Sequence, residues 1–198
     1  MTTAAVDLLW LPLGAGDTSG LVRWSGRAYE AISAHREHRS CRDLYHSALE
    51  VRLDDNWYAV EMTPAWGLTP DVDRVVVVTG SVGLPGLGRS RLFRYEVHSW
   101  RGGAIPDAAD AVGGPRRLST KREHARSVLD LLPRFPARTW GRDELATGDM
   151  WNSNSLTSWL LLRSGLDARH IGPPQNGRAP GWSAGLAVAA REIAMSPA

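Results

Sequence analysis

A serine at the start of an apolar helix is the residue in this chain best placed to act as a nucleophile. Residues 151–166 read WNSNSLTSWLLLRSGL, in which short polar side chains suited to helix capping precede leucines at helical spacing. Ser155 is predicted in the first turn, on the same face as Trp159. Free backbone N–H groups and the positive end of the helix dipole could stabilise an oxyanion there. The pattern predicts either a nucleophile or a cluster that only caps the helix.

A histidine that could serve as a general base lies on a predicted β-hairpin. Residues 44–62 read LYHSALEVRLDDNWYAVEM, two alternating runs joined by a polar turn. A turn at Asp55 and Asn56 would pair Glu50 with Glu61, which places His46 and Glu61 on one face of the sheet. A base oriented by a carboxylate is the arrangement that nucleophilic catalysis needs.

Three other interpretations of the hairpin and its neighbours stay open. His46 could be a satisfied core histidine, and Glu61 could form a salt bridge with Arg52. His98, on a further predicted strand, competes with Glu61 as the third polar member of a site.

The remaining elements must place these groups around one core. Alternation and helical spacing predict strands at 6–13, 74–79 and 91–100, and helices at 21–38, 120–132 and 183–195. The 74–79 strand is expected to be buried. In the 21–38 helix, an apolar stripe at helical spacing with charges elsewhere predicts an amphipathic helix; the stripe is Trp24, Ala28, Ala31 and Ile32. Thr120 is expected to cap the 120–132 helix.

The glycine-rich segment 80–91 does not predict a nucleotide site. A phosphate-binding loop must open a helix, whereas the following residues alternate as a strand, and the segment contains no lysine. It is predicted to form a hairpin or lid. Arg89 and Arg91 could contact an acidic group of a substrate, or they could be solvated.

Composition restricts the class of protein. The 198 residues fit one domain, 1–198, and 43% of them are hydrophobic. The net charge of +2 comes from scattered arginines, with Lys121 the only lysine, which argues against nucleic-acid binding. Cys41 is the only cysteine, so no disulfide framework or cysteine zinc cluster is expected, and a cytoplasmic location is predicted. No metal, cofactor or membrane span is expected, and the oligomeric state is not determined.

Two short motifs, taken in order, resemble the circularly permuted papain-like proteins of the NlpC/P60 superfamily, which include lecithin retinol acyltransferase-like and PPPDE enzymes. LYHSALEV matches the histidine strand at Tyr45 and His46. NSLTSW matches the N-C-x-x-aromatic motif at Asn154 and Ser155, with Trp159 one position later than the family aromatic. The whole sequence also resembles an actinobacterial family without assigned function.

The resemblance implies an α+β fold, a papain-like antiparallel sheet packed against the helix that carries the nucleophile. It implies hydrolysis or acyl transfer at an amide, thioester or ester bond of an unidentified small-molecule or peptide substrate. Ser155 would attack in place of the family cysteine, with His46 as base and Glu61 as its orienting group.

The predicted supporting residues complete this hypothesis. Asn152 or Asn154 would hold the oxyanion with the Ser155 N–H, and Trp159 would line an apolar cleft. Ser153 is the rival nucleophile, disfavoured because it is expected to precede the helix. The alternative function is a catalytically inactive papain-like relative that binds a small ligand or a protein.

Overall fold

An open sheet forms the centre of the computed structural model, which describes residues 3–15, 21–66 and 73–195. The sheet is seven-stranded, with the order β4-β5-β3-β2-β1-β6, and β7 pairs with β2 off this path. All neighbours on the path are antiparallel, whereas β7 is parallel to β2. The strands are β1 (Ala4–Pro12), β2 (Asp43–Leu53), β3 (Asn56–Pro64), β4 (Arg74–Ser81), β5 (Arg94–Arg101), β6 (Arg116–Ser119) and β7 (Gly177–Arg178).

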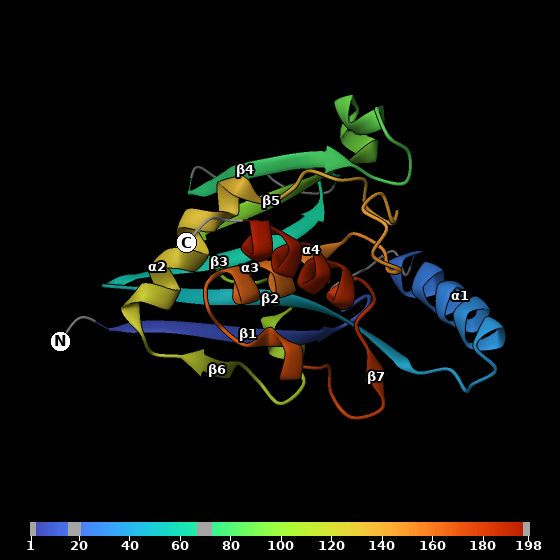
Figure 1. Cartoon of the computed structure of the whole chain (residues 1–198), viewed down its shortest axis with the longest axis horizontal. Coiled ribbons are helices and arrows are strands. Elements are labelled where there is room, and N and C mark those ends of the chain that lie inside the picture. The colour runs from blue at the N-terminus through green and yellow to red at the C-terminus, as the bar shows by residue number, and fades with distance from the viewer. Residues whose placement is uncertain (1–2, 16–20, 67–72, 196–198) are drawn as a thin grey trace.

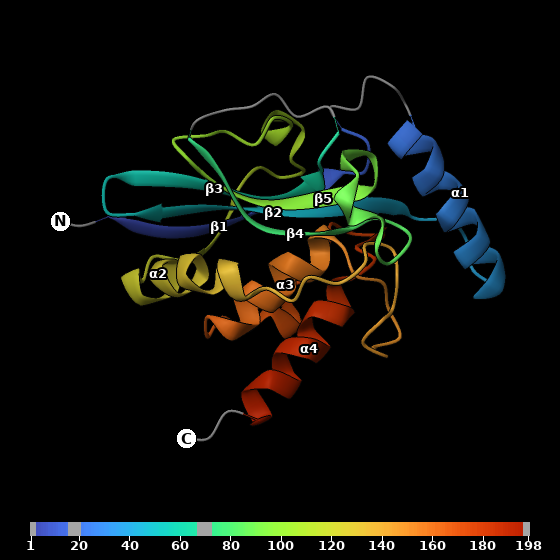
Figure 2. The same ribbon diagram turned by 90° about the horizontal axis from the view of Figure 1, so that it is seen from above.

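Helices cover one face of this sheet (Figure 1). They are α2 (Arg122–Leu131), α3 (Ser153–Arg163) and α4 (Trp182–Met195), whereas α1 (Leu21–Arg36) lies at one end of the sheet. Figure 2 shows the three helices below the sheet and the segment between β5 and β6 above it. The expected α+β class is therefore confirmed. None of the described helices is both long and apolar enough to span a bilayer.

Two hydrophobic clusters fill the two faces of the sheet. The larger cluster lies between the strands and the helices and includes Leu49, Val97 and Leu160. The smaller one lies on the opposite face, where Ile105 packs with Leu9 and partners from β1, β2 and β3. Because both clusters draw on β1, its apolar run is buried on both faces, as a continuous apolar strand predicts.

α3 is the central helix, because every residue from Ser153 to Leu162 is buried. Its apolar residues lie all round the helix, as expected for a helix that packs against both a sheet and a second helix. Close packing against α4 depends on Gly185. A Cβ atom there would lie 2.1 Å from the Ser158 Oγ and 2.2 Å from the Ser155 carbonyl oxygen.

The predicted hairpin between β2 and β3 is present, but its turn lies one residue earlier than expected. Leu53 pairs with Asn56 and Glu50 pairs with Ala59, so Asp54 and Asp55 form the turn. Asp54 adopts a positive φ of 56°, which Asp tolerates better than most residues. The pairing moves by two residues, so the predicted face is unchanged and Glu61 remains on the same face as His46.

Three local expectations are wrong. The 74–79 run was expected to be buried, but β4 is an edge strand, with Val75 56% exposed. A run of β-branched residues predicts a strand but does not indicate which elements lie beside it. The apolar stripe of α1 faces outward, with Trp24 72% exposed, because α1 packs at the end of the sheet through its other side. At α2 the Ser119 hydroxyl, rather than Thr120, accepts a backbone N–H, from Lys121.

We predict that Gly185→Ala destabilises the protein although alanine favours helices by about 1 kcal/mol. The added methyl group would force α3 and α4 apart, at a cost on the order of 1–3 kcal/mol. Urea unfolding would measure the loss. The control is Gly172→Ala, where no atom lies within 4 Å of the new Cβ. Equal stability of the two variants would contradict close α3–α4 packing.

Candidate active site

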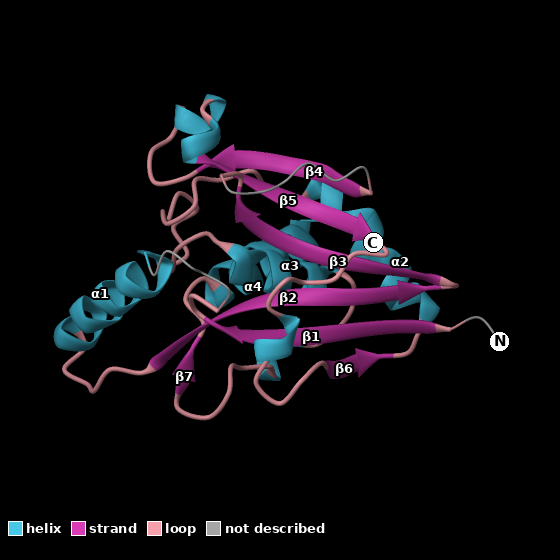
Figure 3. Ribbon diagram, turned by 180° about the vertical axis from the view of Figure 1, so that it is seen from behind, coloured by secondary structure: helices cyan, strands magenta, loops and turns pink. Residues whose placement is uncertain are grey.

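A cavity lies where β2 and β3 separate. Their ladder runs from Leu53–Asn56 to Leu49–Val60. Beyond that pair, β2 continues beside β1 and β3 continues beside β5, and Figure 3 shows the two strands diverging toward α1. The cavity measures about 520 Å³ and is lined by both strands, α1, the start of α3 and the segments around Pro106 and Trp140. This volume lies within the range of small-molecule sites.

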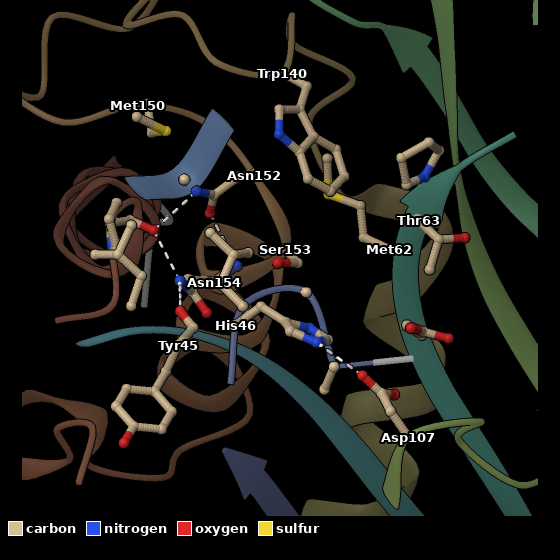
Figure 4. Close-up of a pocket in the computed structure, with 18 of the residues that line it drawn as sticks. Tyr45, His46, Met62, Thr63, Asp107, Trp140, Met150, Asn152, Ser153 and Asn154 are labelled. Atoms are coloured by element: carbon tan, nitrogen blue, oxygen red, sulfur yellow. Dashed lines mark hydrogen bonds and ion pairs between the residues drawn. The ribbon is translucent and has the colours of Figure 1, made fainter. Parts of the chain in front are cut away.

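Ser153 is the serine that lines this cavity. It is the first residue of α3, directly after the capping residue Asn152. Among the described residues, neither the hydroxyl nor the backbone N–H of Ser153 has a hydrogen-bond partner. Figure 4 shows its side chain near those of His46, Met62 and Trp140. Ser153 therefore combines a free hydroxyl with a free N–H at the positive end of the helix.

Ser155, the predicted nucleophile, occupies a different environment. It is 0% exposed and does not line the cavity. Its Oγ accepts the N–H of Asn152 at 3.1 Å and lies 2.8 Å from the Gly181 carbonyl oxygen. Together with the Asn152 side chain, it forms a capping box. The inward orientation is confirmed, but Ser155 faces the helix packing, so the capping interpretation describes it correctly.

His46 is held by a carboxylate that the sequence analysis did not identify. The His46 Nε2 lies 3.2 Å from the Asp107 Oδ2, and both residues line the cavity (Figure 4). A proton on Nε2, donated to Asp107, leaves Nδ1 as the acceptor, and Nδ1 has no partner among the described residues. Asp107 lies in the loop after β5. Ile105 anchors this loop to the smaller hydrophobic cluster, on the face of the sheet opposite the helices. In the sequence, only the apolar Ile105 within this turn-rich segment indicated that the loop packs against the sheet.

Glu61 and His98, the two predicted third members, do not hydrogen-bond to His46. Glu61 lines the cavity, and burial is the main cause that raises its pKa, with Asp107 adding to the rise and His46 opposing it. His98 lies opposite Glu61 on β5. It is buried with its Nε2 3.6 Å from Glu96, and burial lowers its pKa. Glu61 is therefore a neighbour of the His46–Asp107 pair, and His98 lies outside the cavity lining.

Asn152 and Asn154 line the cavity, but their amide hydrogens serve the fold. Both Nδ2 atoms donate to the Pro180 carbonyl at 2.8 Å, and that of Asn154 also donates to the Tyr45 carbonyl at 3.0 Å. The Ser47 hydroxyl donates to the Asn154 Oδ1 at 2.8 Å. These bonds tie the start of α3 to β2 and to the segment before α4. The two asparagines therefore position Ser153, and its own N–H is the free donor.

The three predicted substrate contacts lie elsewhere. Trp159 is 1% exposed in the core, and its Nε1 donates to Glu192. Arg89 is exposed in the β4–β5 connection, and Arg91 donates to the Ala65 carbonyl at 3.3 Å. None of them lines the cavity, whose aromatic lining residues are Tyr29, Tyr45 and Trp140. Within the described ranges, no group of His, Cys, Asp and Glu side chains could hold a metal ion.

Comparison of the chain with protein-family models, curated proteins and solved structures found no match. The interpretation of the cavity therefore depends on the geometry of its own residues.

We predict that Glu61→Gln stabilises the protein at pH 8 but not near pH 4. The folded state binds the Glu61 proton more tightly than the unfolded state, because burial raises the pKa. Wild-type stability is therefore lost as the pH rises from the unfolded pKa, about 4.3, to the folded pKa, by about 1.4 kcal/mol for each unit of difference. The amide carries no such penalty.

Urea unfolding of both proteins at the two pH values would measure this difference. A stability difference that is the same at pH 4 and pH 8 would contradict the buried charge.

Proposed function

We propose that the chain is a serine-dependent hydrolase or acyltransferase that acts on an ester, thioester or amide bond, with Ser153 as the nucleophile. One observation carries the proposal. Ser153, with a free hydroxyl and a free N–H, shares a cavity with a histidine that is held by a carboxylate. Nucleophile, base and orienting group are the three parts that acyl transfer by a serine needs.

Each group would have one role in the reaction. The His46 Nδ1 takes the hydroxyl proton as the Ser153 Oγ attacks the acyl carbonyl carbon, and Asp107 stabilises the imidazolium that forms. The Ser153 N–H and the helix dipole stabilise the oxyanion. The imidazolium then gives its proton to the leaving group as the bond between that group and the acyl carbon breaks. Water or another acceptor, deprotonated by His46, attacks the acyl carbon, and the imidazolium returns the proton to the Ser153 Oγ as the acyl–serine bond breaks.

The resemblance to permuted papain-like proteins supports the same assignment if the nucleophile motif is matched two residues earlier in the sequence. With Ser153 at the nucleophile position, Asn152 precedes it as in the family motif, and Leu156 stands where the family has an aromatic residue. His46 still comes first in the chain, on a strand, and the nucleophile still begins a helix. The papain-like relationship is part of this proposal.

We predict that an alkyl fluorophosphonate labels Ser153. The activated hydroxyl would attack phosphorus and displace fluoride, and peptide mass spectrometry would locate the adduct. Ser153→Ala should abolish labelling, whereas Ser155→Ala should retain it, because that variant loses bonds to Asn152 and Gly181 outside the cavity, at a cost on the order of 1–3 kcal/mol. His46→Ala should slow labelling by about 100-fold or more.

Urea unfolding of each variant would confirm that it is folded under the labelling conditions. An unlabelled wild-type protein would contradict the proposed enzymatic activity. It would favour the alternative function, in which the protein binds a small ligand or a protein partner without catalysis. Labelling of Ser155 would contradict the assignment of the nucleophile.

A further inference from the structure

The Glu61 residue lines the cavity. Among the described residues, no hydrogen bond or ion pair engages its carboxylate, although His46 and Asp107 lie close enough to affect the pKa of Glu61. The proposed acyl transfer does not use it, because Asp107 holds His46. A half-buried carboxylate with no partner is costly, so its presence in a cavity wall calls for a function.

Both carboxylates in the cavity lining, Glu61 and Asp107, are close to His46. The ionisable residues that line the cavity are Tyr29, Tyr45, His46, Glu61 and Asp107, and the described lining contains no lysine or arginine. Arg74 opposes the raised pKa of Glu61, but its guanidinium stacks 4.3 Å from the Trp100 ring centroid and does not line the cavity. The cavity therefore favours a cation over an anion.

Much of the rest of the wall is apolar. Leu13, Leu44, Met62, Trp140 and Met150 contribute to it. Burial raises the pKa of Glu61, and the negative charge of Asp107 adds to the rise. Burial destabilises the charged form of this carboxylate, and a cationic group of a ligand would stabilise it again.

We propose that the cavity binds a substrate with a primary ammonium group near the reacting acyl carbonyl and an apolar remainder, and that Glu61 accepts hydrogen bonds from the ammonium. Placement beside the reacting carbonyl rests on the proposed function, because Ser153 and Glu61 line the same cavity. Anionic substrates of the same size are disfavoured by the two carboxylates.

Three six-carbon compounds test this site: hexylamine, which is an ammonium ion at pH 8, the neutral 1-hexanol and the anionic hexanoate. Calorimetric titration of the wild-type protein should show hexylammonium binding about tenfold or more tighter than 1-hexanol, and no binding of hexanoate. Glu61→Gln should remove the preference for the ammonium ion. The matched control is Glu50→Gln, because burial also raises the pKa of Glu50 but that residue lines a different hollow.

Equal binding of hexylammonium and 1-hexanol, or unchanged ammonium binding by Glu61→Gln, would overturn the proposed site. Ser153→Ala should retain the preference, because the nucleophile does not contact the ammonium. Fluorophosphonate labelling reports separately on the reaction. A wild-type protein that is not labelled but binds hexylammonium through Glu61 would overturn the proposed function and leave the ammonium site supported.

Discussion

The capping of α3 by Asn152 is the interaction on which the candidate site depends. The Asn152 Oδ1 accepts the N–H groups of Asn154 and Ser155, so it fixes where the helix begins. The amide groups of Asn152 and Asn154 both donate to the Pro180 carbonyl, and Asn154 also binds β2. With these bonds in place, the first residue of the helix, Ser153, lines the cavity, and the third, Ser155, turns into the packing with α4.

The long-range part of the site could not be read from sequence periodicity. Alternation predicted the β2–β3 hairpin but placed its turn one residue too late. His46 and Glu61 nevertheless lie on the predicted face, because the pairing moved by an even number of residues. Asp107 is 61 residues from His46 in a loop, where no periodic pattern applies. Asn152 and Ser155 form a capping box in the structure, although Ser155 stands where the sequence signature has Glu or Gln. A helix predicted to begin after Asn154 therefore placed Ser155, and not Ser153, at the helix start.

The polar groups in the cavity wall lower the stability of the folded protein, and the packing of the rest of the fold offsets this cost. β2 and β3 separate beyond Leu49 and Val60, and the groups at the opening are His46, Glu61 and Asp107. Two carboxylates beside one histidine in a partly buried wall are poor choices for stability. The buried α3 and the apolar clusters on both faces of the sheet support them. Such local conflict with folding is typical of functional sites.

The central claim is that Ser153, which shares the cavity with His46, is the activated position, and the reactivity of a cysteine placed there tests it most directly. In a Cys41→Ser background, the rate of iodoacetamide reaction would be measured against pH for Ser153→Cys and Ser155→Cys. A thiol beside His46 at the helix start should titrate well below the ordinary pKa of about 8.5, and adding His46→Ala should remove that shift. The cysteine at position 155 should be protected from reaction. An ordinary pKa at position 153, or a faster reaction at position 155, would contradict the account.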